Sequence, residues 1–141
     1  TIKLHNKLSF VKIGHNTSAF IYKDKKTYTV RLHSGFIKTL FKADENANEL
    51  DVMTQNSFSK VENSKTLFIY NSLFKKTSLV NYKGKVAFSN INDKNQSVML
   101  NKLEYSFIDK RMKTPEKAHN LTPKQLKQLL SASSIDEKKL N

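Results

Sequence analysis

Tyrosine and lysine side chains alternate closely at two places in this 141-residue sequence, and together they have the chemistry needed to hold a polyanion. Proteins that bind single-stranded nucleic acid stack bases on aromatic rings while lysines follow the phosphates. The alternative for each tyrosine is a half-buried core residue with its hydroxyl in water. The candidate binding residues are Tyr22, Lys23, Lys25, Lys26, Tyr28, Arg31, Lys75, Lys76, Tyr82, Lys83, Lys85, Lys110, Arg111 and Lys113.

Residues for bond-breaking chemistry do not form any recognisable set. The chain has no cysteine, which excludes disulfides, thiolate metal sites and cysteine nucleophiles. The four histidines lack metal-ligand spacing, and the three glycines form no phosphate-binding loop. Asp44, Asn46 and Asn48 match the start of a calcium loop, but Glu49 stands where that loop needs glycine. We therefore expect a protein that is not an enzyme and needs neither metal nor cofactor.

The net charge of +13 and the pI near 9.9 favour an anionic partner. Among 25 basic residues only Arg31 and Arg111 are arginines, so the charge indicates contact with little sequence preference. A coding bias towards lysine is the alternative explanation. Residues 1–42 carry a net +8 and residues 63–113 a net +7, whereas residues 43–62 between them carry −4. This uneven distribution favours a folded domain with one basic face.

Residues 7–33 have the period and the turn residues of three successive β-strands. Near the end of this segment Tyr28 and Val30 alternate with polar residues, which is typical of a half-buried strand. Residues 14–18 and 24–26 are rich in turn-forming residues. We expect the three strands to form an antiparallel meander.

The hydrophobic period changes after the meander. An apolar stripe predicts a short helix over residues 34–42. Further strands are expected at residues 50–55, 66–70 and 86–91, with polar connections at residues 56–63 and 75–85. Residues 98–112 fit both a helix and a strand, and their aromatic and β-branched residues favour the strand.

The residues that typically begin a helix occur near the end of the sequence. Thr122 is the expected N-cap, Pro123 the first helical residue, and Gln125 completes a capping box. So short a helix is marginal alone, so its apolar side chains need a surface to pack on. The docking residues are Leu126, Leu129 and Leu130. We expect them to pack on the chain's own domain, with a protein partner or a second copy as the alternative.

These elements predict an α+β, β-rich fold with an N-terminal three-stranded antiparallel meander, a short helix, further antiparallel strands and a C-terminal capped helix. Their order is compatible with an OB-like barrel and with other small barrels or sheets. No residue motif identifies a family. The expected divisions are a β-rich core domain at residues 1–113, a linker at 114–121 and a helical tail at 122–141.

The predicted function is sequence-tolerant binding of nucleic acid, with single-stranded DNA or RNA favoured, through a basic, tyrosine-containing face. The alternative is a protein-interaction module, such as an adaptor, structural accessory or inhibitor, that binds an acidic protein surface with the C-terminal helix as docking element. No apolar run approaches the roughly 18 residues of a membrane span. The first residues do not resemble a signal peptide, so we expect a cytoplasmic protein without a membrane partner.

Overall fold

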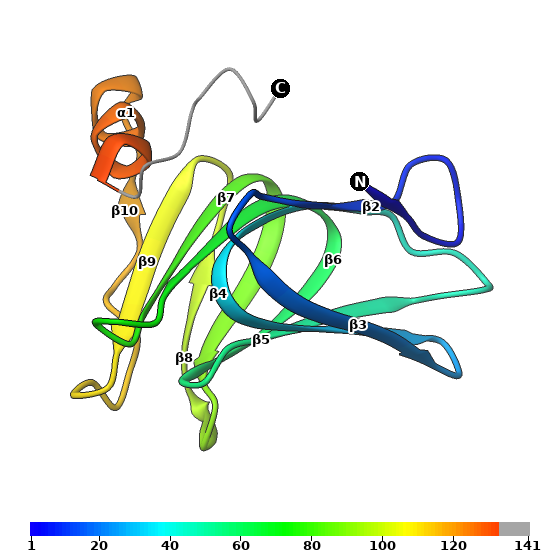
Figure 1. Cartoon of the computed structure of the whole chain (residues 1–141), viewed down its shortest axis with the longest axis horizontal. Helices are drawn as coiled ribbons and strands as arrows, with labels where there is room; N and C mark the ends of the chain where they lie inside the picture. Colours follow the sequence, from blue (N-terminus) through cyan, green and yellow to red (C-terminus); the bar gives the residue numbers. More distant parts are fainter. Residues whose placement is uncertain (133–141) are drawn as a thin grey trace.

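The computed structural model describes residues 1–132, which form ten β-strands followed by one helix (Figure 1). The elements are β1 (Ile2–Lys3), β2 (Phe10–Ile13), β3 (Ser18–Asp24), β4 (Thr27–Phe41), β5 (Glu49–Met53), β6 (Ser57–Asn71), β7 (Lys76–Asn90), β8 (Asp93–Leu100), β9 (Glu104–Asp109), β10 (His119–Asn120) and α1 (Pro123–Ala132). Strands β4, β6 and β7 are the longest, with 15 residues each, and they run through both of the parts into which the sheet divides.

Strand β4 changes partners halfway along its length. Its first half pairs with β3 and, in parallel, with β5, whereas its second half pairs with β2 and β6. The change falls beside Gly35, whose φ of +93° lies in the region that glycine adopts without strain. A Cβ atom at Gly35 would lie 2.3 Å from Oγ1 of Thr17. Gly35 therefore permits both the kink of β4 and the close approach of the preceding turn.

The pairings divide the sheet into two parts that share the three long strands. The first part contains β3, β4, β5, β6, β7 and β8, and the second contains β1, β2, β4, β6, β7, β9 and β10. Because β4 pairs with β6 both directly and through β5, the sheet curls on itself (Figure 1). The inner faces of both parts supply one core. Its members include Val11, Val30, Leu32, Ile37, Phe41, Leu50, Val52, Val61, Phe68, Leu79, Val86, Phe88, Leu100 and Ile108.

Helix α1 covers a second, smaller apolar cluster on the outer face of the second part. Leu130 packs there with Leu67, Ile69 and Val80. The expected capping box is confirmed, because the Thr122 N–H donates to Oε1 of Gln125 at 3.0 Å and the Gln125 N–H donates to Oγ1 of Thr122 at 3.2 Å. The helix is thus fixed at its start by its own sequence.

Two predictions about the first 42 residues need correction. The predicted helix at 34–42 is wrong, since these residues continue strand β4. Ile37 and Phe41 face the main core while Phe36 packs with the second cluster, and a strand buried on both sides imitates a helical stripe. The meander is wrong in its pairing, because β2 pairs with β4 and not with β3. The OB-like arrangement is not confirmed, since the sheet is open and mixed.

The later strands were predicted with mixed success. Strands at 50–55, 66–70 and 86–91 are confirmed in β5, β6 and β7. The preference for strand over helix at 98–112 is confirmed too, but these residues form the end of β8 and the whole of β9, with a turn at 101–103 between them. The polar connections at 56–63 and 75–85 are wrong, because both segments are largely strand. Several of their polar side chains are buried, namely Ser57, Ser59, Thr77, Ser78 and Asn81, and some of these form internal hydrogen bonds. The Asn81 amide, for example, donates to the carbonyls of Gly84 and Leu100. The expected linker at 114–121 contains β10, which pairs with β9.

Candidate interaction surface

Strand β3 leaves one edge of the sheet open. Within residues 1–132 it pairs with β4 alone (Figure 1). Ala19 and Ile21 pack against the main core but stay half-buried, whereas their partners on β4, Leu32 and Val30, are fully buried. The core is therefore partly uncovered at this edge, where unpaired backbone groups can receive a further strand.

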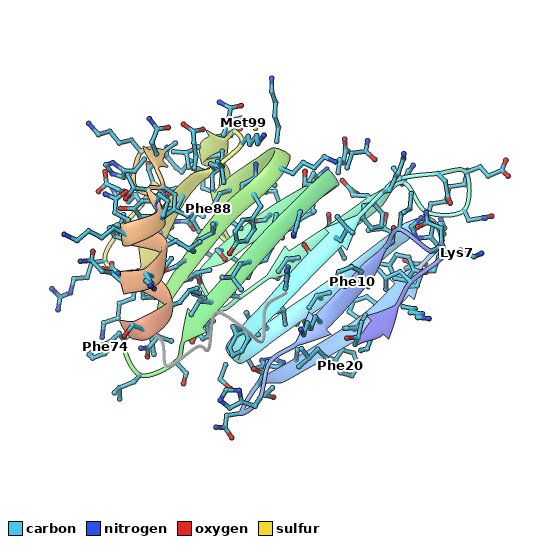
Figure 2. The ribbon with its side chains drawn as sticks, turned by 90° about the horizontal axis from the view of Figure 1, so that it is seen from above. Lys7, Phe10, Phe20, Phe74, Phe88 and Met99 are labelled. Atoms are coloured by element: carbon cyan, nitrogen blue, oxygen red, sulfur yellow. The ribbon has the colours of Figure 1, made fainter. Side chains whose placement is uncertain are left out.

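Two aromatic rings project from the outer face of β3. Phe20 is 59% exposed and Tyr22 is 39% exposed, with ring centroids 5.9 Å apart. The register places Phe20 opposite Arg31 and Tyr22 opposite Thr29 on β4. Figure 2 shows Phe20 at the margin of the sheet. An aromatic pair and a guanidinium group thus share one face beside the open edge.

The turn between β3 and β4 adds exposed lysines to this edge. Nζ of Lys23 lies 5.4 Å from the centroid of the Tyr28 ring. Lys25 has a φ of +56°, and the Lys26 carbonyl accepts a 3.0 Å hydrogen bond from the Asn48 N–H. The turn is therefore anchored to the loop before β5. We call the set Phe20, Tyr22, Lys23, Lys25, Lys26 and Arg31 the β3 edge surface.

The other two candidate tyrosines pack against their own sheet. The Tyr28 ring lies 5.7 Å from His5 and 6.5 Å from Phe41, measured between centroids. Burial first, and Asp44 second, raise the pKa of the Tyr28 hydroxyl above its ordinary value. Tyr82 packs with the second cluster, and Nζ of Lys65 lies 5.7 Å from its ring centroid. Both rings are half-buried, so Tyr22 is the most exposed of the three candidates.

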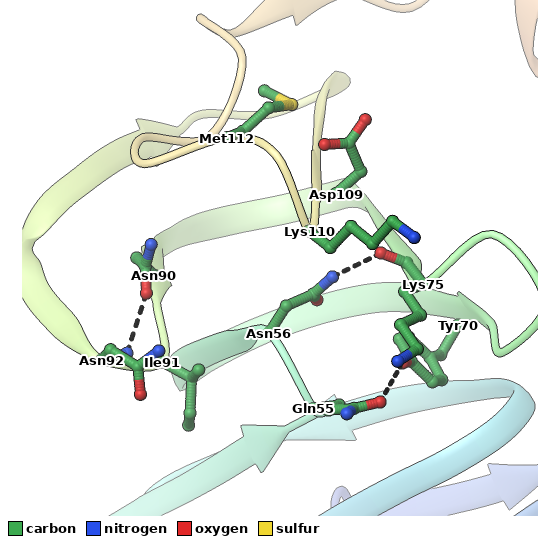
Figure 3. Close-up of a pocket in the computed structure, with 10 residues that line it drawn as sticks. All are labelled: Gln55, Asn56, Tyr70, Lys75, Asn90, Ile91, Asn92, Asp109, Lys110 and Met112. Carbon is green, nitrogen blue, oxygen red and sulfur yellow. Dashed lines mark hydrogen bonds between the residues drawn. The ribbon is translucent and has the colours of Figure 1, made fainter.

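A second group of candidates gathers where the β6–β7 turn meets the loop after β9. Lys76 pairs with Asp109, which brings Lys75, Lys76, Lys110 and Arg111 to one corner of the molecule. Lys75 and Lys110 line a polar pocket of about 230 Å³ (Figure 3). Its other lining residues are Gln55, Asn56, Tyr70, Asn90, Ile91, Asn92, Asp109 and Met112.

Hydrogen bonds fix the walls of this pocket (Figure 3). The Asn56 amide donates to the Lys75 carbonyl at 2.6 Å, and the Tyr70 hydroxyl donates to Oε1 of Gln55 at 3.0 Å. The Asn90 amide donates to the carbonyl of Lys113 at 2.9 Å, so Lys113 takes part through its backbone. The pocket is polar and preformed, with lysine ammonium groups from two separate loops.

The remaining candidates, Lys83 and Lys85, lie in the middle of β7. Lys83 pairs with Lys65, and Lys85 pairs with Glu62. Glu49 pairs with Thr27 next to the β3–β4 turn, so acidic side chains separate Lys85 from that turn. Thirteen of the fourteen candidates therefore fall in three places, namely the β3 edge surface, the corner beside the β6–β7 turn and the middle of β7, and the fourteenth, Tyr28, packs against the main core.

An acidic residue that the sequence did not single out, Asp51, lies on β5, two strands in from Tyr22. Asp51 pairs with Thr29 on one side and Lys60 on the other. Burial first, and Glu49 second, raise the pKa of its carboxyl to about 6, against the opposing effect of Lys60 and Lys94. Within residues 1–132 its Oδ1 atom has no hydrogen-bond partner, whereas Glu49 forms an ion pair with Lys60 at 2.9 Å. Alternation of polar residues in the strand was the only sequence signal for it.

The three leucines of the predicted docking face pack on the chain's own sheet. Leu130 is buried, and Leu126 and Leu129 are half-buried against the second cluster. Docking on the chain's own domain is thus what the structure shows. A role of these leucines in holding a partner stays a prediction, and it requires the partner to displace this packing.

Residues 1–132 contain neither a metal-binding cluster nor a helix that could span a membrane. There, no three histidine, aspartate or glutamate side chains come together as a metal site would require. No helix in the same range has both the length and the apolar character to cross a membrane.

Comparisons with known proteins find a similar fold and no family. No protein-family model matches the sequence, and no curated protein matches it significantly. Two crystal structures, at 1.65 and 2.50 Å resolution, are each provisionally described as an anti-sigma factor from Parabacteroides distasonis ATCC 8503. They resemble this chain over 85% and 86% of its length, with TM-scores of 0.60 and 0.61 and identities of 12% and 11%. This chain spans 51% and 63% of those two chains, and the likeness establishes a shared β-rich fold.

Proposed function

We propose that the chain is a protein-interaction module whose β3 edge surface receives an extended, acidic segment of a partner protein. The observation that carries the proposal is the open edge itself, where Ala19 and Ile21 are half-buried beside the exposed rings of Phe20 and Tyr22. An added strand gains backbone hydrogen bonds along β3 and covers the uncovered side of the core.

The charge around the edge selects the chemistry of the segment. Lys23 and Asp24 end β3, Lys25 and Lys26 form the turn to β4, and Arg31 lies opposite Phe20, so Asp24 is the one carboxylate among these five residues. Carboxylates of a partner strand would meet these cations, which favours aspartate and glutamate and speeds association. The solved structures with a similar fold are described as anti-sigma factors, a description that implies a protein target, and this agrees with the proposal.

Binding of single-stranded nucleic acid is the competing candidate. Its support is the exposed pair Phe20 and Tyr22 beside Arg31, since aromatic rings next to a guanidinium group also suit stacked bases. Less favourable to it are the half-buried rings of Tyr28 and Tyr82 and the acidic side chains between the basic groups. Protein binding, by contrast, requires only the open edge of β3 and the lysines beside it.

Amide chemical-shift mapping separates the two candidates. The probe is a ten-residue peptide in which valine and threonine alternate with aspartate and glutamate, and the comparison ligand is oligothymidylate. We expect the acidic peptide to shift the amide resonances of Ser18–Asp24. Methylation of every second peptide nitrogen removes the N–H donors along one edge of the peptide strand, so it should weaken binding. If the peptide shifts amides elsewhere, or shifts none, then β3 is not the edge that binds it. Tighter binding of oligothymidylate at the amides of β3 would favour nucleic acid as the partner.

Paired charge reversals provide the matched control. Lys25→Glu with Lys26→Glu changes the β3–β4 turn, whereas Lys83→Glu with Lys85→Glu makes the same change of charge in the middle of β7. We expect the first pair to weaken peptide binding roughly tenfold, equivalent to about 1.4 kcal/mol, and the second pair to leave it nearly unchanged. Equal losses in the two variants would mean that net charge alone attracts the peptide.

A further inference from the structure

We propose that the tip of the β6–β7 hairpin is a contact site for an anionic lipid surface. Leu73 is 82% exposed and Phe74 is 66% exposed, more than any other large hydrophobic side chain in residues 1–132. Adjacent apolar side chains this open to water are costly unless they have a partner, and they mark an interaction site. Figure 2 shows Phe74 at the margin of the molecule.

The backbone of the tip is held in the conformation that presents these side chains. Oδ1 of Asn71 accepts hydrogen bonds from the N–H groups of Leu73 at 3.0 Å and Phe74 at 3.2 Å. Lys75 closes the turn with a φ of +50°, in the left-handed region. Because the turn is already ordered, little conformational entropy is lost when the tip binds.

Basic side chains surround the apolar pair. Lys75 and Lys76 follow it directly, and the pairing of Lys76 with Asp109 brings Lys110 and Arg111 alongside. The Asp109 carboxylate is the only acidic group in this set, and its Oδ1 accepts the Arg111 N–H at 2.9 Å. Apolar side chains that enter the acyl boundary, combined with cations at the level of the headgroups, form a two-component membrane contact.

The shape of the site favours lipid over a protein partner. The two apolar side chains stand on the turn of a hairpin, which can enter a soft interface, whereas a stable protein interface needs a broader complementary area. The β3–β4 turn lies at the other end of the molecule's long axis (Figure 1), so the lipid contact and the β3 edge surface are independent. A contact of this kind needs no spanning helix, and it departs from our expectation of no membrane partner.

A single tryptophan tests the contact directly, because the chain has none of its own. Phe74→Trp is mixed with vesicles of phosphatidylcholine, or of equal parts phosphatidylcholine and phosphatidylglycerol. We expect a blue shift of emission and quenching by brominated acyl chains with the anionic vesicles only. Met99→Trp, at another exposed apolar position, should show neither effect. An unshifted Phe74→Trp emission spectrum would overturn the proposal. The alternative would then be that the tip enters a pocket on a partner protein.

Vesicle sedimentation of the full chain tests whether the tip drives binding. We expect Leu73→Ser with Phe74→Ser to lower the partition coefficient on anionic vesicles at least roughly tenfold, because two apolar side chains no longer enter the interface. The control, Leu8→Ser with Met99→Ser, removes two other exposed apolar side chains and should change it by less than about twofold. Binding that is equal in all three proteins and vanishes with salt would reduce the effect to net charge and overturn the proposal.

Discussion

The Asn56 side chain ties together three segments that shape the polar pocket, so Asn56→Ala should be among the most destabilising polar substitutions in the chain. Its amide donates to the carbonyl of Lys75 at 2.6 Å and, more weakly, to that of Ile108 at 3.4 Å. Its carbonyl oxygen accepts from the hydroxyls of Thr77 at 2.5 Å and Thr54 at 3.1 Å. The turn before β6 is thereby joined to the β7 end of the β6–β7 turn and to β9.

The expected loss follows from these bonds. A hydrogen bond contributes about 1 kcal/mol net to stability, and a partner left unsatisfied away from water costs about 1–3 kcal/mol. The bonds of Asn56 to Ile108, Thr77 and Thr54 are part-buried, whereas the Lys75 carbonyl is exposed and can bond to water instead. The Thr54 and Thr77 hydroxyls can still bond to each other at 2.7 Å, which limits the damage on the carbonyl side. We therefore expect Asn56→Ala to lower the free energy of unfolding by about 2–3 kcal/mol.

Equilibrium urea unfolding measures this loss. Asn92→Ala is the control, because Asn92 lines the same pocket but its exposed side chain forms no hydrogen bond within residues 1–132. The control should change the free energy by less than about 0.5 kcal/mol. Similar values for the two variants would refute the reasoning, since they would mean that the network around Asn56 contributes nothing beyond the pocket surface.

Three further changes have clear expected outcomes. Because the pKa of Asp51 is raised to about 6, its protonated form stabilises the fold at low pH and this contribution is lost as pH rises through 6. Asp51→Asn should therefore raise the Tm at pH 7.5, by the equivalent of about 1 kcal/mol after allowance for solvent screening, and have little effect near pH 4. Gly35→Ala should lower the free energy of unfolding, measured in urea, by about 3 kcal/mol, because the new Cβ meets the side chain and backbone of Thr17 at a positive φ. Gly14→Ala should cost less, because it has no positive φ to strain and meets a side chain, the Phe36 ring, with no backbone atom among its nearest contacts. Thr122→Ala removes the N-cap and should speed hydrogen exchange of the α1 amides about fivefold, for about 1 kcal/mol, while leaving β6 amides unchanged.

Local sequence patterns predicted those parts of the fold that depend on neighbouring residues. The capping box at Thr122 and Gln125 forms as its spacing required, and the alternation around Tyr28 and Val30 does lie in a strand. Residues 34–42 were misread because both faces of β4 are buried there, so the apolar residues no longer alternate with polar ones. Burial on two sides is a property of the tertiary structure, and no local period reports it.

The candidate site was harder to predict because a sequence shows where charges lie along the chain but not which part of the folded surface they occupy. The sequence suggested one basic face, but strand pairing sends Lys25, Lys75 and Lys85 to different places. Burial also could not be assigned to single tyrosines, and it separates the exposed Tyr22 from the half-buried Tyr28 although the two lie on one hairpin. The exposure of Leu73 and Phe74 could not be predicted, because an isolated apolar pair in a sequence resembles part of a hydrophobic core.

The mistaken meander and the open edge of β3 have the same physical origin. In a meander β2 would pair with β3 and cover its free side. Instead the kink at Gly35 turns the second half of β4 away from the first, and β2 pairs with that second half. Strand β3 is left beside the first half of β4 with no neighbour in residues 1–132 on its other side. A substitution that relaxes the kink should therefore change amide exchange along β3 more than along β8, because β3 pairs directly with β4 whereas β8 pairs with β7.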